Sequence, residues 1–224
     1  MAEALSPLAL FEPGHTLAWA WIANCTYPWE VLHEIRELIP EIGAALDPAR
    51  YDRPVADVWI AKTASVAPTA SITGPCIIGE DTEVRPGAYI RGAVLVGDGC
   101  VVGNSTELKN CILFDGVQVP HYNYVGDSLL GHLAHMGAGA VTSNVKSDKT
   151  PVSVHNGDEI IETRLPKLGA VLGDGAEIGC GAVLNPGTVI CPRSSVYPLA
   201  SVRGVVPPDS ILKSGKGTEL VRRT

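Results

Sequence analysis

The sequence predicts an all-β solenoid, a left-handed parallel β-helix of six-residue repeats with a small N-terminal helical cap. Three observations predict this fold class. An apolar residue recurs at every sixth position, glycine often occupies the next position, and aromatic residues are too few to fill a broad core. Aromatic residues make up 5% of the 224 residues and hydrophobic residues 46%, so we expect a narrow core of valine, isoleucine, leucine and alanine.

The apolar repeat starts at Ile60 and keeps a period of six over a long stretch of the chain. Ten of its first eleven positions are large apolar residues, in the order Ile60, Val66, Ile72, Ile78, Val84, Ile90, Val96, Val102, Leu108, Phe114 and, as the exception, Pro120. The series then slips and resumes at Tyr124, Leu130, Met136 and Thr142, and after an insertion at Leu172, Ile178, Leu184, Ile190, Val196 and Val202.

Each repeat is expected to form one short strand and one turn, in which glycine adopts a positive φ at little steric cost. Three repeats would close a coil of about eighteen residues, and about seven such coils would stack, each on its neighbours. A β-sandwich would instead show alternation at period two and turns every 8–12 residues. The strict period of six does not fit that alternative.

The repeat divides the chain into an N-terminal helical cap segment at 1–55, the β-helix at 56–210 with a loop insertion at 145–168, and a tail at 211–224. Helical spacing of apolar residues predicts a helix over 29–39, which we expect to cover the open first coil. These apolar residues are Trp29, Val31, Leu32, Ile35, Leu38 and Ile39. The insertion is expected to project from the coil, either as a functional loop or as a plain insertion. The tail is short and basic.

Charge, cysteine content and hydropathy limit the possible functions. A net charge of −7 makes nucleic acid an unfavourable partner, because phosphate binding needs a basic face. The six cysteines include no Cys-x-x-Cys pair, which argues against a zinc site, and we expect them to be reduced. Residues 1–10 lack the features of a signal peptide, and no stretch approaches the ~20 apolar residues that span a membrane. We therefore expect a cytoplasmic protein without a membrane partner.

Polar residues crowd into the segment where the register slips, which is where a functional site is expected. They include His121, Asn123, Tyr124 and Asp127, followed by His132, His135 and Asn144. Arg91 and Lys109 are one predicted coil apart, so we expect them to stack on one face. A phosphate held by arginine and lysine beside a histidine base would be a chemically coherent site.

The same residues carry a resemblance to a known family. In order, the chain has Gly103-Asn104, Glu107 and Lys109, then His121, Tyr124, Gly126 and Asp127, then Gly137-Ala138-Gly139, and then Asn144. Residues 78–144 thereby resemble the acetyltransferase domain of the bifunctional N-acetylglucosamine-1-phosphate uridyltransferase/glucosamine-1-phosphate acetyltransferase. They also resemble the tails of archaeal-type sugar-1-phosphate nucleotidyltransferases. Each piece alone is weak, and the ordered set is specific to this branch of hexapeptide-repeat proteins.

The resemblance implies an acetyl-CoA-dependent N-acetyltransferase acting on an amino-sugar phosphate, with its sites shared between the subunits of a homotrimer. His121 would be the general base, and the backbone amide of Ala138 would face the developing oxyanion. The implied substrate-binding residues are Arg91, Lys109, Tyr124, His135 and Asn144. Acetyl-CoA would lie near Cys180 and, in the next coil, Pro198, and no metal ion is implied.

The sequence departs from the family pattern at several positions. Gly92 follows Arg91 where the family has proline, and His135 stands where the family has asparagine. The family's lysine after Asn144 has no counterpart at the same spacing, although Lys146 and Lys149 are close. Residues 1–55 contain no glycine-rich nucleotide signature and are too few for a nucleotidyltransferase domain, so we expect no nucleotidyltransferase activity from this chain.

Two other functions remain open at this stage. The chain could be a non-catalytic trimeric partner or scaffold for a separate sugar nucleotidyltransferase. It could also resemble the γ-class carbonic anhydrases, although His121, His132 and His135 stand at the wrong separations for their zinc ligands. The same residues could also have purely structural roles. His121 could be a polar turn residue, Arg91 and Lys109 could be solvated surface charges, and Tyr124 could be a core residue.

Overall fold

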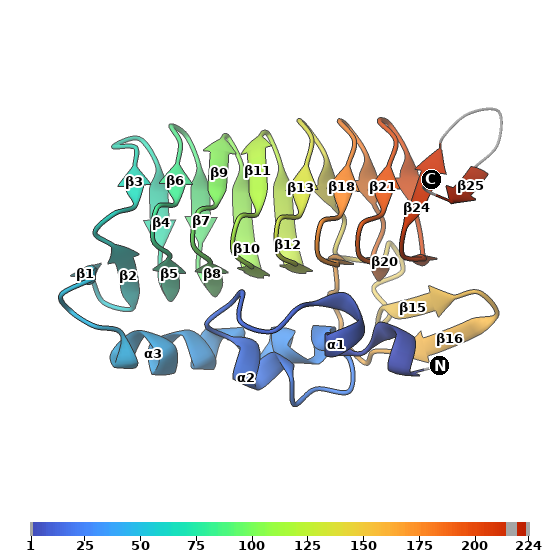
Figure 1. Ribbon diagram of the computed structural model, residues 1–224, viewed down its shortest axis with the longest axis horizontal. Helices are drawn as coiled ribbons and strands as arrows, with labels where there is room; N and C mark the ends of the chain where they lie inside the picture. Colours follow the sequence, from blue (N-terminus) through green and yellow to red (C-terminus); the bar gives the residue numbers. More distant parts are fainter. Residues whose placement is uncertain (1, 214–218, 223–224) are drawn as a thin grey trace.

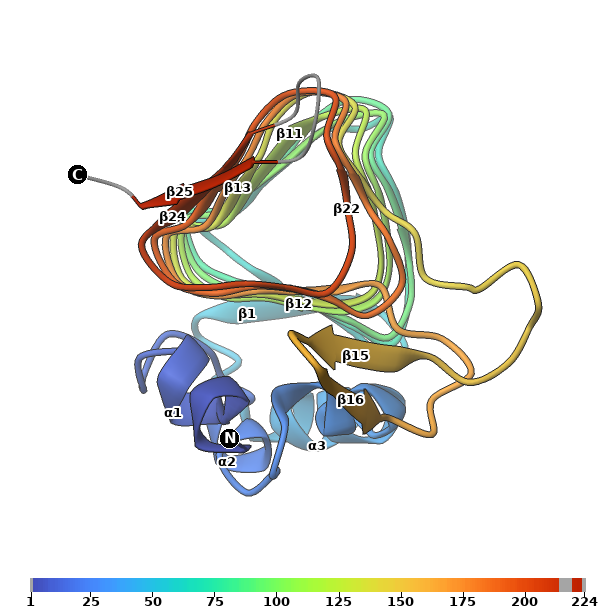
Figure 2. The same cartoon turned by 90° about the vertical axis from the view of Figure 1, so that its right-hand side faces the viewer.

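The computed structural model describes residues 2–213 and 219–222, most of which form a triangular solenoid (Figures 1 and 2). Figure 2 looks at the C-terminal end, so the chain advances toward the viewer as it winds. It passes clockwise from the left face over the top corner to the right face, and then along the bottom face. A clockwise path that advances toward the viewer is left-handed. The predicted left-handed parallel β-helix is confirmed.

The left face is a sheet of parallel strands that runs the length of the solenoid. Its strands are β3 (Ser65–Val66), β6 (Glu83–Val84), β9 (Val101–Asn104), β11 (Gln118–His121), β13 (His135–Met136), β18 (Glu177–Ile178), β21 (Ser195–Val196) and β24 (Ser210–Lys213). At the C-terminal end β25 (Glu219–Arg222) pairs antiparallel with β24. The predicted tail from residue 211 therefore begins inside the solenoid, whereas Lys216 and Arg223 lie outside the described residues.

The right and bottom faces join through two strands that bend round their common corner. The right face consists of β4 (Ser71–Thr73), β7 (Tyr89–Arg91), the first halves of β10 (Glu107–Leu113) and β12 (Tyr124–Leu130), β14 (Val141–Thr142), β19 (Val183–Leu184) and β22 (Ser201–Val202). The bottom face consists of β1 (Tyr51–Val55), β2 (Val58–Ala61), β5 (Cys76–Ile78), β8 (Val94–Val96), the second halves of β10 and β12, β17 (Ala170–Leu172), β20 (Thr188–Ile190) and β23 (Val205–Val206). All these pairings are parallel except that of β1 with β2.

The predicted register is wrong from Phe114 to Tyr124, because two coils are one residue short, and it is correct again from Leu130 onward. Ile78 pairs with Val96 at a separation of eighteen residues, but Val96 pairs with Leu113 at seventeen. The missing residue falls at the corner between the right and bottom faces. Asn110 and Asp127 occupy this corner in successive coils, each at φ +49°, a conformation that asparagine and aspartate tolerate better than other side chains.

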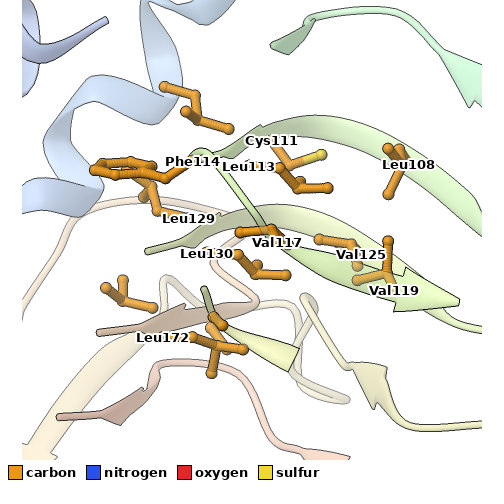
Figure 3. Close-up of a cluster of buried hydrophobic side chains, with 14 of the residues drawn as sticks. Leu108, Cys111, Leu113, Phe114, Val117, Val119, Val125, Leu129, Leu130 and Leu172 are labelled. Carbon is orange, nitrogen blue, oxygen red and sulfur yellow. The ribbon is translucent and has the colours of Figure 1, made fainter. Parts of the chain in front are cut away.

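This shortened corner changes which residues fill the core. Figure 3 shows Leu108, Leu113, Val119, Val125 and Leu130 in the buried cluster, and all five are fully buried. Phe114, Pro120 and Tyr124, which the period of six assigned to the interior, therefore point outward instead, since side chains alternate along a strand.

Phe114 is nevertheless fully buried, because the N-terminal segment covers it. Its ring lies 4.6 Å from that of Phe11, measured between centroids. Pro120 and Tyr124 are half-buried at the surface. A fixed period of six thus found the repeat but misplaced these three side chains.

The N-terminal segment lies along the bottom face and not across the end of the solenoid (Figures 1 and 2). It contains η1 (Ala2–Leu5), α1 (Pro7–Leu10), α2 (Trp19–Ile22), η2 (Pro28–His33) and α3 (Ile35–Ala45). The single helix expected over 29–39 is wrong, because the chain forms the 3-10 helix η2 and then α3. All six apolar residues predicted to form its packing face are buried. The expected cover over the first coil is therefore wrong in its position.

The composition of the bottom-face strands explains this position. Their outward residues are also large and apolar, and each is no more than 1% exposed: Ile77, Leu95, Ile112, Leu129, Val171 and Val189. A strand that is apolar on both sides must be covered on both sides. α3 packs on β5, β8 and β10, and η2 packs on β12.

The insertion at 145–168 first projects from the right face and then folds under the C-terminal coils (Figure 2). It forms an antiparallel hairpin of β15 (Ser153–Asn156) and β16 (Glu159–Glu162), and β15 packs beside β20 and β23. Gly187 and Gly204 allow this close packing. A Cβ atom at either glycine would lie 2.6 Å from a carbonyl oxygen of β15. The hairpin continues the cover that the helices provide at the other end of the bottom face.

All six cysteines are free thiols, as expected. Cys76, Cys100, Cys111 and Cys191 are buried, whereas Cys180 is exposed. Burial raises the pKa of Cys191 to about 11 and that of Cys76 further, so neither thiol ionises near neutral pH. Within residues 2–213 and 219–222, no helix has the length and apolar character needed to cross a membrane.

Candidate functional site

Four of the predicted site residues lie in one row along the top corner, between the left and right faces. We call His121, Ala138, Cys180 and Pro198 the corner row. Backbone hydrogen bonds connect successive coils here: Gly139 donates to the carbonyl of His121 at 3.0 Å, and Gly181 donates to that of Ala138 at 2.8 Å. The Cβ position of Gly179 lies 2.4 Å from the nitrogen of Pro198. Residues that are far apart in sequence thus lie on adjacent coils.

The imidazole of His121 is exposed, and its ring makes no hydrogen bond or ion pair within the described part of the chain. Its backbone is held firmly: the N–H of His121 donates to Oδ1 of Asn123 at 3.1 Å. The buried amide of Asn123 donates in turn to the carbonyls of Gly137 at 2.8 Å and Ala140 at 3.0 Å. Asn123 therefore fixes the turn of His121 to the turn of the next coil.

Ala138 lies in that next turn, and its side chain is exposed. Its backbone N–H has no hydrogen-bond partner among the residues that the structure describes, whereas its carbonyl accepts from Gly181. Gly139 adopts φ +71°, which turns the chain tightly after Ala138. An exposed imidazole and an unpaired backbone donor thus lie on neighbouring coils of one corner.

A second group, Lys109, Tyr124, Asp127 and Asn144, lies at the corner between the right and bottom faces. We call it the Asp127 cluster. Nζ of Lys109 lies 3.0 and 3.1 Å from the two carboxylate oxygens of Asp127. Asn144 donates from Nδ2 to Oδ2 of Asp127 and, at 3.3 Å, to the hydroxyl of Tyr124. The structure therefore joins the predicted residues Lys109, Tyr124 and Asn144 through Asp127.

Asp127 has a buried side chain, 6% exposed, and no role was predicted for it from the sequence. Nδ2 of Asn110 also donates to Oδ1 of Asp127 at 2.9 Å and to the carbonyl of Leu32 at 3.2 Å, which ties the cluster to η2. Burial, and then the negative charge of Asp127, raises the pKa of Tyr124 above its usual value, so its phenol is neutral. Asp127 could have been noticed in the sequence because it is an aspartate at the corner where the period of six fails.

Arg91 stacks one coil from Lys109, as predicted, because Ile90 pairs with Leu108 in register. Its guanidinium forms an ion pair with Glu107, with 2.6 Å between Nη1 and Oε1. This hydrogen bond with Glu107 raises the pKa of Arg91 above its usual value. Each of the two predicted phosphate-binding cations thus has a carboxylate partner.

His135 does not join the other predicted residues. It lies on the left face, where its Nδ1 is 2.8 Å from Oε2 of Glu177. His132 lies at the corner between the bottom and left faces, where its ring stacks on that of His15 at 3.7 Å between centroids. The three histidines of the carbonic anhydrase alternative therefore occupy separate places, and no cluster of three metal-binding side chains occurs within residues 2–213 and 219–222.

The corner row and the Asp127 cluster border the same right face. Tyr124 comes three residues after His121, just past the turn at the top corner, where β12 begins. Its side chain reaches across the outside of the face, because its hydroxyl contacts Asn144 and lies 2.5 Å from the Cβ position of Gly126. A ligand on this face could contact an exposed histidine at one edge and a lysine at the other.

Curated relatives at 32–40% identity carry the name "Bifunctional protein GlmU". The protein from Methanococcus maripaludis strain C5 is 40% identical over 90 residues, which is 40% of this chain and 21% of the relative. Another from Methanococcus maripaludis strain S2 is 32% identical over 171 residues, or 66% of this chain and 36% of the relative. The chain thus spans between about a fifth and about a third of the relatives that it matches.

Two solved structures are similar at lower identity. The acetyltransferase domain of PglB from Neisseria gonorrhoeae is 21% identical with a TM-score of 0.37, covering 84% of this chain and 66% of that one. WeeI from Acinetobacter baumannii is 16% identical with a TM-score of 0.43, covering 86% of this chain and 66% of that one.

A family model matches the solenoid directly. It covers residues 72–206, more than half of the chain, and its description is "GMPPB C-terminal domain". The match includes the whole corner row and the Asp127 cluster. The chain therefore belongs to the family of GMPPB C-terminal domains, and it is similar to part of the GlmU proteins.

Proposed function

We propose that the chain is an acetyl-CoA-dependent N-acetyltransferase whose acceptor is an amino-sugar phosphate similar to glucosamine-1-phosphate. The observation that carries this proposal is the free imidazole of His121 beside the unpaired N–H of Ala138, on the same face as Lys109. Similarity to GlmU proteins at 32–40% identity supports an acyltransferase of sugars. We place the reaction in the cytoplasm, where thiols such as the exposed Cys180 remain reduced.

The proposed reaction is a direct transfer. The imidazole of His121 takes a proton from the amino group of the sugar while the sugar nitrogen attacks the thioester carbonyl carbon. The carbonyl oxygen becomes an oxyanion that accepts a hydrogen bond from the N–H of Ala138. The carbon–sulfur bond then breaks, and the leaving CoA thiolate takes the proton from His121. The products are the amide and CoA, and the histidine is neutral again.

The sugar phosphate would be bound by Arg91, Lys109, Tyr124 and Asn144. Lys109 has three donors, so it can keep its contact with Asp127 and still donate to a phosphate. Arg91 is more exposed than Lys109, and a phosphate would compete with Glu107 for its guanidinium. This assignment predicts that phosphate binding weakens at high salt, because the Arg91 contact is exposed.

The active assembly is proposed to be a homotrimer with sites between protomers. His135 and the Asp127 cluster lie on different faces of one chain, so they could share a substrate only if the left face of one protomer meets the right face of another. Acetyl-CoA would then lie in the groove along Cys180 and Pro198. The bottom face is covered by the helices and the hairpin and is not available for this contact.

The test is a titration with acetyl-CoA followed by a free-thiol release assay with glucosamine-1-phosphate. We expect turnover in the wild-type chain and none in His121→Ala, with the oligomeric state of both compared by light scattering. Turnover by an intact His121→Ala variant contradicts the role of this residue as the base. Absence of acetyl-CoA binding contradicts the enzyme proposal and favours the non-catalytic partner of a nucleotidyltransferase. Synthesis of a UDP-sugar from UTP by the pure chain would contradict the proposed lack of nucleotidyltransferase activity.

A further inference from the structure

A polar cavity lies where the insertion meets the right face of the C-terminal coils. We call it the loop pocket, and its volume is about 400 Å³. Its chemistry comes from six of its lining residues: Ser143, Lys146, Asp148, His155, Asn185 and Arg203. None of these six was predicted to bind a substrate. The volume is within the range of about 300–1,000 Å³ that is usual for small-molecule sites.

The solenoid supplies one wall of the loop pocket and the insertion supplies the other. Val141 pairs with Val183 and Val183 with Ser201, so Ser143, Asn185 and Arg203 stack two positions further along these coils. The insertion leaves the face after Ser143 and returns through β15. The backbone of β15 is held close to the solenoid, because the carbonyl oxygen of His155 lies 2.6 Å from the Cβ position of Gly204.

The loop pocket carries an excess of positive charge. Arg203 has no ion pair or hydrogen bond from its guanidinium within the described residues, although most other arginines of the solenoid pair with a carboxylate. Lys146 donates to the hydroxyl of Thr150 at 2.6 Å and lies 3.6 Å from Asp148. The ring of His155 also has no partner among these residues. One carboxylate therefore faces two permanent cations and a histidine.

We propose that the loop pocket binds a phosphate group of a nucleotide. An unpaired guanidinium, a lysine and serine hydroxyls are the donors that a phosphate accepts from, and the remaining volume accommodates an attached ribose. Arg203 lies far from Lys109 among the proposed sugar-phosphate contacts, whereas Asn144 stands between the lining residues Ser143 and Val145. Lys109 and Arg203 are four strand positions apart, through β12, β14 and β19 to β22, which is about 19 Å.

Two ligands of an enzyme on this face could present such a group. One is the 3′-phosphate and diphosphate portion of coenzyme A, and the other is the diphosphate of a nucleotide-linked sugar. Both place a ribose beside the phosphates, so the pocket chemistry is the same. Phosphate binding in the loop pocket can be measured without turnover and so independently of the proposed acetyl transfer.

The experiment is a calorimetric titration of the full chain with three probes: pyrophosphate, adenosine 3′,5′-bisphosphate and UDP. We expect at least one nucleotide to bind, with an affinity that falls tenfold or more in Arg203→Gln and in Lys146→Gln. The matched control is Arg36→Gln, which removes the same charge from the exposed side of α3 and should leave the affinity unchanged.

The preferred probe identifies the source of the phosphate. Tighter binding of adenosine 3′,5′-bisphosphate assigns the pocket to the donor, and tighter binding of UDP assigns it to a nucleotide-linked acceptor. Equal binding of all three probes shows that the pocket recognises phosphate alone. Binding of none of them, or binding that survives both Arg203→Gln and Lys146→Gln, overturns the proposal whatever the outcome of the acetyl-transfer assay.

Discussion

Replacement of Asp127 by alanine should lower the free energy of unfolding by about 3 kcal/mol, which is at the low end of the cost of breaking a buried ion pair. The carboxylate accepts hydrogen bonds from Lys109, Asn110 and Asn144, and all three donors would lose it together. Lys109 is 27% exposed and can regain water, which reduces the cost. Alanine at φ +49° adds about 1 kcal/mol of backbone strain that aspartate largely avoids.

Urea unfolding followed by circular dichroism measures this difference, at one protein concentration so that assembly does not contribute. The matched control is Asp127→Asn, which keeps the shape and the tolerance of positive φ but removes the charge. We expect it to cost about half as much, since an amide oxygen still accepts from Asn110. A free energy of unfolding for Asp127→Ala within about 0.5 kcal/mol of the wild-type value, the range of ordinary surface substitutions, would contradict this prediction.

Two further predictions follow from the covered corners of the solenoid. Phe114→Ala should cost about 3–5 kcal/mol by thermal unfolding, because its ring is fully buried against Phe11, whereas the exposed Leu133→Ala should cost little. Burial raises the pKa of Asp115, so its contribution to stability is present in acid and is lost as the pH rises through that raised pKa. Asp115→Asn should therefore gain stability relative to the wild type as the pH rises from about 4 toward neutrality; a difference that does not change with pH contradicts this.

The fold was predictable because a solenoid repeats one local rule, and a single rule can be read from a single sequence. The rule failed at Asn110 and Asp127, where a corner lacks one residue. The missing residue could not be detected at Phe114, because this large apolar residue occupies a position where the period of six predicts one. Its burial depends on Phe11, which is about a hundred residues away, and a local pattern cannot report such a contact.

The position of the helices could have been inferred from the bottom-face strands, several of whose triplets are apolar at all three positions. Cys76-Ile77-Ile78 and Val94-Leu95-Val96 offer no polar side to water. A period of six samples one residue of each triplet and misses this property. The helical spacing of the N-terminal segment identified its buried side correctly but contained no information about which surface it would meet.

The site was partly predictable for the same reasons. The family resemblance assigned His121 and Ala138, and the structure places them on neighbouring coils in register. Asp127 was not assigned a role because its contacts depend on the shortened corner. Arg203 belongs to a pocket that exists only when the insertion folds back, and the sequence of the insertion does not specify that path.

The N-terminal segment also changes how the solenoid can come apart. Coils of a repeat protein contact only their neighbours, so their ends tend to open first. Here the N–H of Asp174 donates to the carbonyl of Leu10 and the N–H of Asp115 to that of His15, while α3 packs as far away as β5. The N-terminal segment thus connects coils that do not contact each other. Opening a coil anywhere between β5 and β17 must also loosen this segment, so amide exchange in these bottom-face strands should be slow at both ends of that range and not only at its centre.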